Sequence, residues 1–138
     1  MKSKKIEFRS QCPISTALDI FGDKWSLLIL RDLIFNNKST YGEFLDTEEK
    51  IATNVLADRL LTLEAGGIIS RHDHPESKVK VLYKLTDKGI DLIPMLVEMI
   101  VWSEKHHKVH PHAVQFAKMV RKDKEGLIKR LRDSLKRA

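Results

Sequence analysis

The sequence is poor in cysteine and has no long apolar run. A single cysteine, Cys12, among 138 residues cannot form a disulfide within one chain, which is typical of a reducing compartment. The most apolar run, Leu27–Leu30, is far shorter than the roughly 20 residues that a membrane-spanning helix needs. The charged amino terminus lacks the apolar stretch of a secretory signal. We therefore expect a cytoplasmic protein that does not enter a membrane.

Motifs for catalysis are also missing. The chain has no Gly-rich phosphate loop, no Gly-x-Ser-x-Gly elbow and no paired-carboxylate motif. His106 and His110 are one helical turn apart, a spacing that zinc sites use. Histidines near the carboxyl end of a helix are, however, stabilised there without a metal. We expect no enzyme, no cofactor and no metal site.

The positive charge is unevenly distributed. The chain carries a net charge of +6, which is typical of nucleic-acid-binding proteins. From Lys105 to Ala138 there are eleven Lys and Arg against three Asp and Glu, whereas everything before carries fourteen against sixteen. The net charge therefore does not indicate a function for the residues before Lys105. Motifs are what indicate a function there.

The central part of the chain predicts two short helices followed by a β-hairpin. The helices and strands are expected, in order, over residues 40–45, 53–64, 68–73 and 79–85. Gly66 and Gly67 stop the second helix, and residues 74–77 form the turn of the hairpin. This order of elements is the anatomy of a winged helix-turn-helix, which places its second helix in a DNA major groove.

The second of these helices has two distinct faces. Its core positions recur at four- and three-residue spacing: Leu56, Leu60 and Leu63. Thr53, Asn54 and Ala57 lie toward the exposed side at the amino-terminal end, the part that such proteins turn toward base edges. The amide of Asn54 is suited to adenine, because it can pair with N7 and N6 together. Thr53 is equally suited to be a helix N-cap. For Asn54 the other interpretation is ordinary solvated surface.

The returning strand of the hairpin alternates apolar and basic residues. One predicted face carries Val79, Val81, Tyr83 and Leu85, and the other carries Lys78, Lys80 and Lys84. A buried apolar face opposite lysines suits a wing that lies against a phosphate backbone. The same pattern is found in edge strands that lysines protect from aggregation, and it is the neighbouring helices that favour DNA.

Helices are also expected before and after this motif. The two preceding helices are expected over residues 13–21 and 24–35. After Thr86 a long helix is predicted, kinked at Pro94, and a last amphipathic helix follows over residues 114–135. The last helix needs a partner for its apolar face, most simply a second copy of the chain. We expect the first helix and the helix after Thr86 to form the dimer contacts.

Cys12 lies at the start of the first predicted helix, three residues after Arg9. Helix amino termini and neighbouring cations favour the reactive thiolate. Cys12 is therefore a candidate for redox sensing. The other interpretation is an unreactive, buried cysteine.

Several stretches occur together in this chain: Cys12-Pro13, Gly22-Asp23-Lys24-Trp25, residues 27–33, Tyr41-Gly42-Glu43-Phe44, residues 51–60, residues 83–89, Pro94 and Trp102. Jointly they resemble the HxlR-type winged-helix transcriptional regulators, relatives of the MarR group. The resemblance covers about residues 12–105 and implies a bacterial regulator that binds a near-palindromic operator as a homodimer. Some members of that family sense electrophiles or oxidants with a cysteine aligned with Cys12.

The resemblance also implies roles for individual residues. Thr40 and Tyr41 would approach the DNA backbone, and Arg59 would support or contact phosphate. The residues that would face the major groove, or flank it from the wing, are Thr53, Asn54, Ala57, Lys78 and Lys80. Many members carry Ser or a basic residue where this chain has Ala52, Asn54 or Asp58. Those departures leave the operator sequence open and speak against a phosphate contact at Asp58.

We therefore expect a mostly α-helical fold with a small β-hairpin wing. The winged helix-turn-helix domain is predicted over residues 12–105, with N- and C-terminal dimerisation helices, and a basic helical extension over residues 106–138. The expected function is a sequence-specific transcriptional regulator, a homodimeric repressor on double-stranded DNA, whose effector the sequence does not give. The alternatives are a winged-helix protein-interaction module without sequence-specific DNA binding, and a basic tail that clamps nucleic acid non-specifically.

Overall fold

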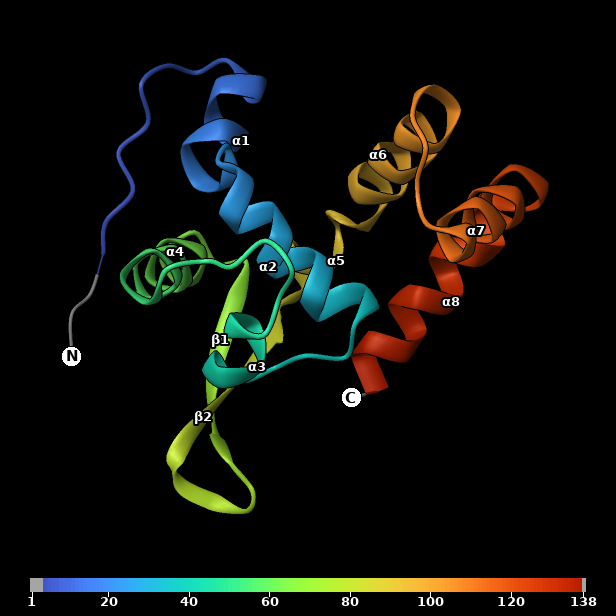
Figure 1. Ribbon diagram of the computed structural model, residues 1–138. Helices are drawn as coiled ribbons and strands as arrows, with labels where there is room; N and C mark the ends of the chain where they lie inside the picture. The colour runs from blue at the N-terminus through green and yellow to red at the C-terminus, as the bar shows by residue number, and fades with distance from the viewer. Residues whose placement is uncertain (1–3, 138) are drawn as a thin grey trace. The chain divides into compact units, whose positions relative to one another are not determined.

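By its internal contacts, the chain divides into two units that meet between Gly89 and Ile90. A computed structural model describes residues 4–137 (Figure 1). The elements before the junction are α1 (Pro13–Phe21), α2 (Lys24–Phe35), α3 (Tyr41–Leu45), α4 (Thr53–Ala65), β1 (Ile69–His74) and β2 (Ser77–Leu85), and the short α5 (Asp87–Ile90) crosses the junction. The elements after it are α6 (Ile93–His106), α7 (Pro111–Lys122) and α8 (Lys124–Arg137). The order of helices and hairpin in the first unit is the predicted one.

The first two helices begin where the sequence predicts and for the predicted reasons. Pro13 opens α1, where its missing N–H costs nothing. Asp23 is the N-cap of α2, and its carboxylate accepts a hydrogen bond from the backbone N–H of Ser26 at 2.9 Å. The buried apolar residues of α2 are Ile29, Leu30, Leu33 and Ile34. This helix is therefore central to the core of the first unit, as its broad apolar surface predicts.

The two strands pair antiparallel, but the tip of the hairpin departs from the predicted alternation. The register runs from Ile69 opposite Leu85 to Asp73 opposite Val81, then shifts to His74 opposite Ser77. Residues 78–80 thus bulge out opposite a single step of β1. The prediction that Val79 belongs to the buried apolar face is wrong: Val79 is 91% exposed, because the bulge breaks the alternation on which that prediction rests.

The single kinked helix predicted after Thr86 is instead two helices, α5 and α6. The Thr86 hydroxyl accepts from the backbone N–H of Gly89 at 3.1 Å, which caps the short α5. Pro94 lies in the first turn of α6, where a proline is tolerated, rather than at an internal kink. The expected kink therefore does not exist, because the chain restarts its helix just before the proline.

The second unit consists of α6, α7 and α8, which pack on one another. The single last helix predicted over residues 114–135 is interrupted at Asp123, whose carboxylate accepts from the N–H of Gly126 at 3.0 Å. Ala117, Val120 and Leu127 are buried. The other predicted apolar positions of the tail are half-buried: Val114, Phe116, Ile128, Leu131 and Leu135. The apolar face of the tail is thus covered only in part by the chain itself, and its cover by a second copy stays a prediction.

Ion pairs join the helices of the second unit. Arg121 lies 2.7 Å from Glu104, Arg132 lies 2.9 Å from Asp91, and Lys124 pairs with Glu98. Each pair joins a base of α7 or α8 to an acid at or just before α6. Part of the tail's positive charge is therefore already neutralised inside this unit.

Candidate nucleic-acid interface

The amino-terminal half of α4 turns one edge to solvent. Thr53, Asn54 and Ala57 are exposed, while Leu56 and Leu60 are buried on the opposite side. The N-cap of α4 is Ala52, and Thr53 is the first helical residue. The interpretation of Thr53 as N-cap is therefore wrong, and α4 begins without a side-chain cap. The hydroxyl of Thr53 is thus not engaged in capping.

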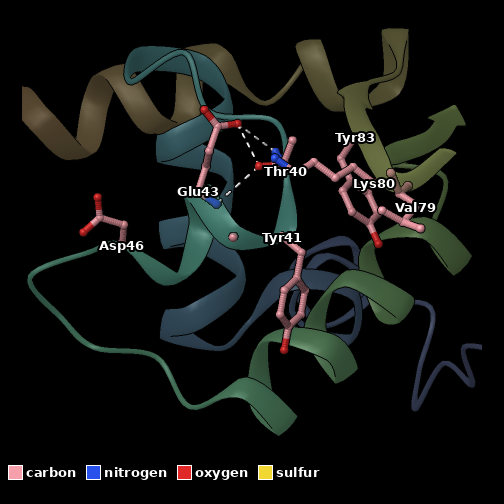
Figure 2. Close-up of a pocket in the computed structure, with 9 residues that line it drawn as sticks. Thr40, Tyr41, Glu43, Asp46, Val79, Lys80 and Tyr83 are labelled. Carbon is pink, nitrogen blue, oxygen red and sulfur yellow. Dashed lines mark hydrogen bonds between the residues drawn. The ribbon is translucent and has the colours of Figure 1, made fainter. Parts of the chain in front are cut away.

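Helix α3 is fixed at its amino terminus by a capping box. Thr40 Oγ1 accepts from the backbone N–H of Glu43, and Glu43 accepts from the backbone N–H of Thr40 at 3.1 Å (Figure 2). The N–H of Ser39 donates to the same carboxylate at 3.1 Å. This hydrogen bond, with those from Thr40, lowers the pKa of the Glu43 carboxyl below its ordinary value. The charged carboxylate of Glu43 thus holds the loop before α3 in place.

Tyr41 connects α3 to α4. Its hydroxyl donates to the backbone carbonyl oxygen of Thr53 at 2.9 Å, across twelve positions of sequence. The bond spans the turn between the two helices of the motif. Tyr41 therefore contributes to the position of the first turn of α4.

The hairpin is attached to the same region through β2. The N–H of Tyr83 donates to the carbonyl oxygen of Ser39 at 2.7 Å, and the Tyr83 ring lies 6.1 Å from that of buried Phe44. Burial raises the pKa of the Tyr83 phenol. The base of the hairpin is thus fixed to the loop before α3, while Lys78 and Lys80 near its tip are exposed.

A cleft of about 640 Å³ separates α3 from the hairpin (Figure 2). Its lining residues are Thr40, Tyr41, Gly42, Glu43, Asp46, Val79, Lys80, Val81 and Tyr83. Three residues that the sequence analysis singled out, Thr40, Tyr41 and Lys80, therefore share one concave surface. Thr53, Asn54 and Ala57 are on α4, which Tyr41 joins to this surface.

Arg59 lies among carboxylates. Its terminal nitrogens are 3.1 Å from Asp58 and 3.6 Å from Asp23. Within residues 4–137, its Nε is buried and has no hydrogen-bond partner. The guanidinium thus joins α4 to the N-cap of α2, an arrangement that suits support of the interface.

Lys4 is a residue of this region that the sequence reasoning missed. Its ammonium donates to the Asp58 carboxylate and to the Thr62 hydroxyl, each at 2.7 Å. The hydrogen bond from Lys4 lowers the pKa of the Asp58 carboxyl. Because 54 residues separate Lys4 from Asp58, no local pattern could have indicated the pair.

Cys12 is exposed and is the N-cap residue of α1. The interpretation of Cys12 as a buried cysteine is therefore wrong. Arg9, the cation three residues before it, donates from Nε to the Asp19 carboxylate at 2.6 Å. The thiol thus lies at a helix start and is open to solvent, and the charge of Arg9 is already paired.

The histidines of the second unit stack on aromatic rings. His106 and His107 lie 5.3 and 5.6 Å from the ring of Trp102, and His110 stacks on His112 at 5.1 Å. In the part of the chain that the structure describes, no group of three or more His, Cys, Asp or Glu could hold a metal ion. Nor is any helix among residues 4–137 long and apolar enough to cross a membrane.

A capped α3, a second helix with one exposed edge and a hairpin beside them define a winged helix-turn-helix. Residues 20–111 match the model of the HxlR-like helix-turn-helix family, and the chain belongs to that family. Each of the relatives described next is a regulator and not an enzyme.

Two relatives illustrate the similarity in sequence. An uncharacterised HTH-type transcriptional regulator of Synechocystis sp., sll1512, is 40% identical over 88 residues, which cover 64% of this chain. The same alignment spans 64% of sll1512, just under two thirds of its length. YodB of Bacillus subtilis, an HTH-type transcriptional regulator, is 33% identical over 97 residues, or 70% of this chain and 86% of YodB.

Solved structures give the same result for the fold. The reduced form of YodB from B. subtilis has a TM-score of 0.57 at 33% identity, covering 70% of this chain and 95% of YodB. The redox regulator HypR in its oxidised form has a TM-score of 0.62 at 31% identity, covering 71% of this chain and all of HypR. The predicted fold class, mostly α with a hairpin wing, is therefore confirmed.

Proposed function

We propose that the protein is a sequence-specific transcriptional regulator that binds a near-palindromic operator in double-stranded DNA as a homodimer and represses transcription. The observation that supports this most directly is the exposed amino-terminal edge of α4, with Thr53, Asn54 and Ala57 free of core packing. In a symmetric dimer, two such helices enter successive major grooves about 34 Å apart.

In this proposal each residue of the interface has a distinct role. Asn54 reads a base edge, with Thr53 and Ala57 against the bases beside it. The residues proposed to meet the DNA backbone are Thr40, Tyr41, Lys78 and Lys80, and Arg59 supports α4 from behind. All of them lie within the proposed DNA-binding domain, residues 12–105, and none lies in the basic extension, residues 106–138.

Exposed apolar side chains support the homodimer. On α1, Ile14 is 71% and Leu18 is 50% exposed; on α6, Met99 is 43% and Trp102 is 59% exposed. These are the two helices that the sequence analysis expects at the dimer contact. Apolar side chains of this size at the surface are typical of a protein–protein interface.

The proposal is tested by selecting bound DNA from a random pool with the purified protein at moderate salt. A recovered inverted repeat with half-sites about 10 base pairs apart is the expected result. Recovery of no sequence above background would contradict the proposal and favour a winged-helix module that binds another protein. A reporter with the recovered sequence placed across its promoter then gives the sign of regulation.

Two single substitutions separate reading of bases from binding of phosphates. Asn54→Ala is expected to lower the discrimination between operator and unrelated DNA by about 1–3 kcal/mol, because a base contact is lost. Lys80→Ala is expected to weaken binding to all sequences alike and to lower the salt slope by about 1. The measurement is a titration of both DNAs at several salt concentrations. If neither change alters DNA affinity, the assigned interface is wrong.

We further propose that Cys12 senses oxidants, since the thiol is exposed and the similar HypR is described as a redox regulator. Treatment with diamide is expected to release the protein from its operator, whereas Cys12→Ser remains bound. Equal release of the two proteins would rule out a thiol switch at this position.

A further inference from the structure

The segment that precedes α1 runs beside α4 and is tied to it (Figure 1). Lys4 donates to Asp58 and to Thr62, which lie one helical turn apart on α4. A Cβ placed on Gly66, just after α4, would come within 3.1 Å of Ile6. The segment therefore contacts the helix proposed to read DNA through Lys4, and Ile6 lies close to the residue that follows the helix.

The charges around Asp58 balance only when Lys4 is included. Asp23 and Asp58 share one guanidinium, that of Arg59, at 3.6 and 3.1 Å. Asp23 is already committed to the N-cap of α2, so its carboxylate is held in place. Lys4, 2.7 Å from Asp58, supplies the second positive charge for the two carboxylates.

Asp58 lies where an uncompensated charge would oppose DNA binding. It follows Asn54 by four residues, so the two side chains share one stripe of α4. The Asp58 side chain is 44% exposed. A carboxylate on the stripe that enters a groove is repelled by the phosphates that line it.

We propose that Lys4 is a positioning residue for DNA binding, which neutralises Asp58 so that the exposed edge of α4 can approach the phosphate backbone. This inference rests on the proposed function, because it assigns to the N-terminal segment a part in the same interface. It identifies an acid–base pair, rather than a lysine alone, as the group that adjusts the affinity of α4 for DNA.

The test is a double-mutant cycle measured as DNA affinity at low salt. Lys4→Ala is expected to weaken binding about fivefold, the upper end of what an exposed ion pair supplies. Asp58→Asn in the Lys4→Ala background is expected to restore the affinity, because the repulsive charge is gone. Asp58→Asn alone is expected to bind at least as tightly as wild type. Lys5→Ala is the matched control, since Lys5 is exposed and makes no ion pair within residues 4–137.

The double variant also separates charge from structure. The double variant lacks the same ion pair as Lys4→Ala. If the loss of DNA affinity came from a displaced α4, that loss would persist in the double variant, together with any fall in the melting temperature. Recovery of affinity without recovery of melting temperature is therefore the expected signature.

Two results would overturn the inference. One is an effect of Lys4→Ala no larger than that of Lys5→Ala. The other is a loss that Asp58→Asn does not restore, which would make Lys4 either a DNA contact itself or, where the melting temperature falls as well, a residue that holds α4 in place. Failure of the wild-type protein to select any DNA would instead contradict the proposed function and is recognised before the variants are made.

Discussion

Glu43 accepts several hydrogen bonds from the loop before α3. Its carboxylate accepts from the N–H groups of Ser39 and Thr40 and from the Thr40 hydroxyl, all within 3.1 Å. The hydrogen bond from the Ser39 N–H is the main cause of its lowered pKa. A carboxyl whose pKa is lowered on folding stabilises the protein above its unfolded pKa, and this stabilisation is lost as the pH falls through the folded pKa.

Glu43→Gln is therefore expected to change the pH dependence of stability. Gln keeps an acceptor oxygen but does not titrate, so the variant should be less stable than wild type near neutral pH and approach it well below 4.5, the ordinary value for Glu. The measurement is the free energy of unfolding in urea at about pH 6 and about pH 3. Other carboxyls with lowered pKa, such as Asp19 and Asp58, are common to both proteins and cancel in the difference. A stability difference that is the same at both pH values would contradict this account.

At the scale of residues, the sequence predicts side chains whose role follows from neighbours in the chain. Asp23 as the N-cap of α2 and Leu56 and Leu60 as core follow from positions three and four residues away, and the structure has them so. Val79 was misassigned because its exposure follows from a bulge in strand pairing. Lys4 was missed because its partner is 54 residues distant.

At the scale of elements, the short helix α5 lies close against the backbone just before β1. A Cβ on Gly89 would lie 2.2 Å from the carbonyl oxygen of Ile68, a backbone atom that cannot rotate away. Gly42 in α3 offers the opposite case, because a Cβ there meets nothing within 4 Å. The two glycines make a matched pair in which the same added methyl group has different surroundings.

Gly89→Ala is expected to lower the free energy of unfolding by about 1–3 kcal/mol, because α5 must move off Ile68. Gly42→Ala is expected to raise it by up to about 1 kcal/mol, since Ala is the better helix former. Urea denaturation of both variants checks the pair. Equal effects of the two substitutions would show that the close approach at Gly89 is not what seats α5.

The boundaries of elements were predicted less well after Thr86 than before it. Apolar periodicity continues across Leu92 and across Asp123. A prediction from periodicity therefore merges α5 with α6 and α7 with α8. In the structure the helix is interrupted at both places. Asp123 caps the start of α8, whereas α6 begins after Leu92 without a side-chain cap. A short polar residue therefore marks the second interruption but not the first, and the apolar pattern conceals both.

At the scale of the whole molecule, charge and predicted DNA contact lie in different units. Residues 1–89 hold fourteen Lys and Arg against thirteen Asp and Glu, and residues 90–138 hold eleven against six. The proposed base-reading residues belong to the nearly neutral unit. The net charge of +6 therefore describes the three-helix unit far more than the helix-turn-helix.

The order of the elements, and hence the fold of the first unit, could be predicted because each element is specified locally. Helix caps, glycine stops and the alternation of β2 all act within a few residues. The contacts that assemble the interface are not local: Tyr41 to Thr53, Tyr83 to Ser39 and Lys4 to Asp58. Their partners are 12, 44 and 54 residues apart, beyond the reach of any periodic pattern.

The bulge at residues 78–80 leaves the ladder below it independent of the hairpin tip. From Asp73 opposite Val81 to Ile69 opposite Leu85, each pairing is fixed on the body side of the bulge. Residues could therefore be inserted or deleted at the tip while every side chain below keeps its face. The length of the hairpin tip can thus change, in evolution or by design, without altering the strand register below it. Such changes would alter how far the wing extends while leaving the fold intact.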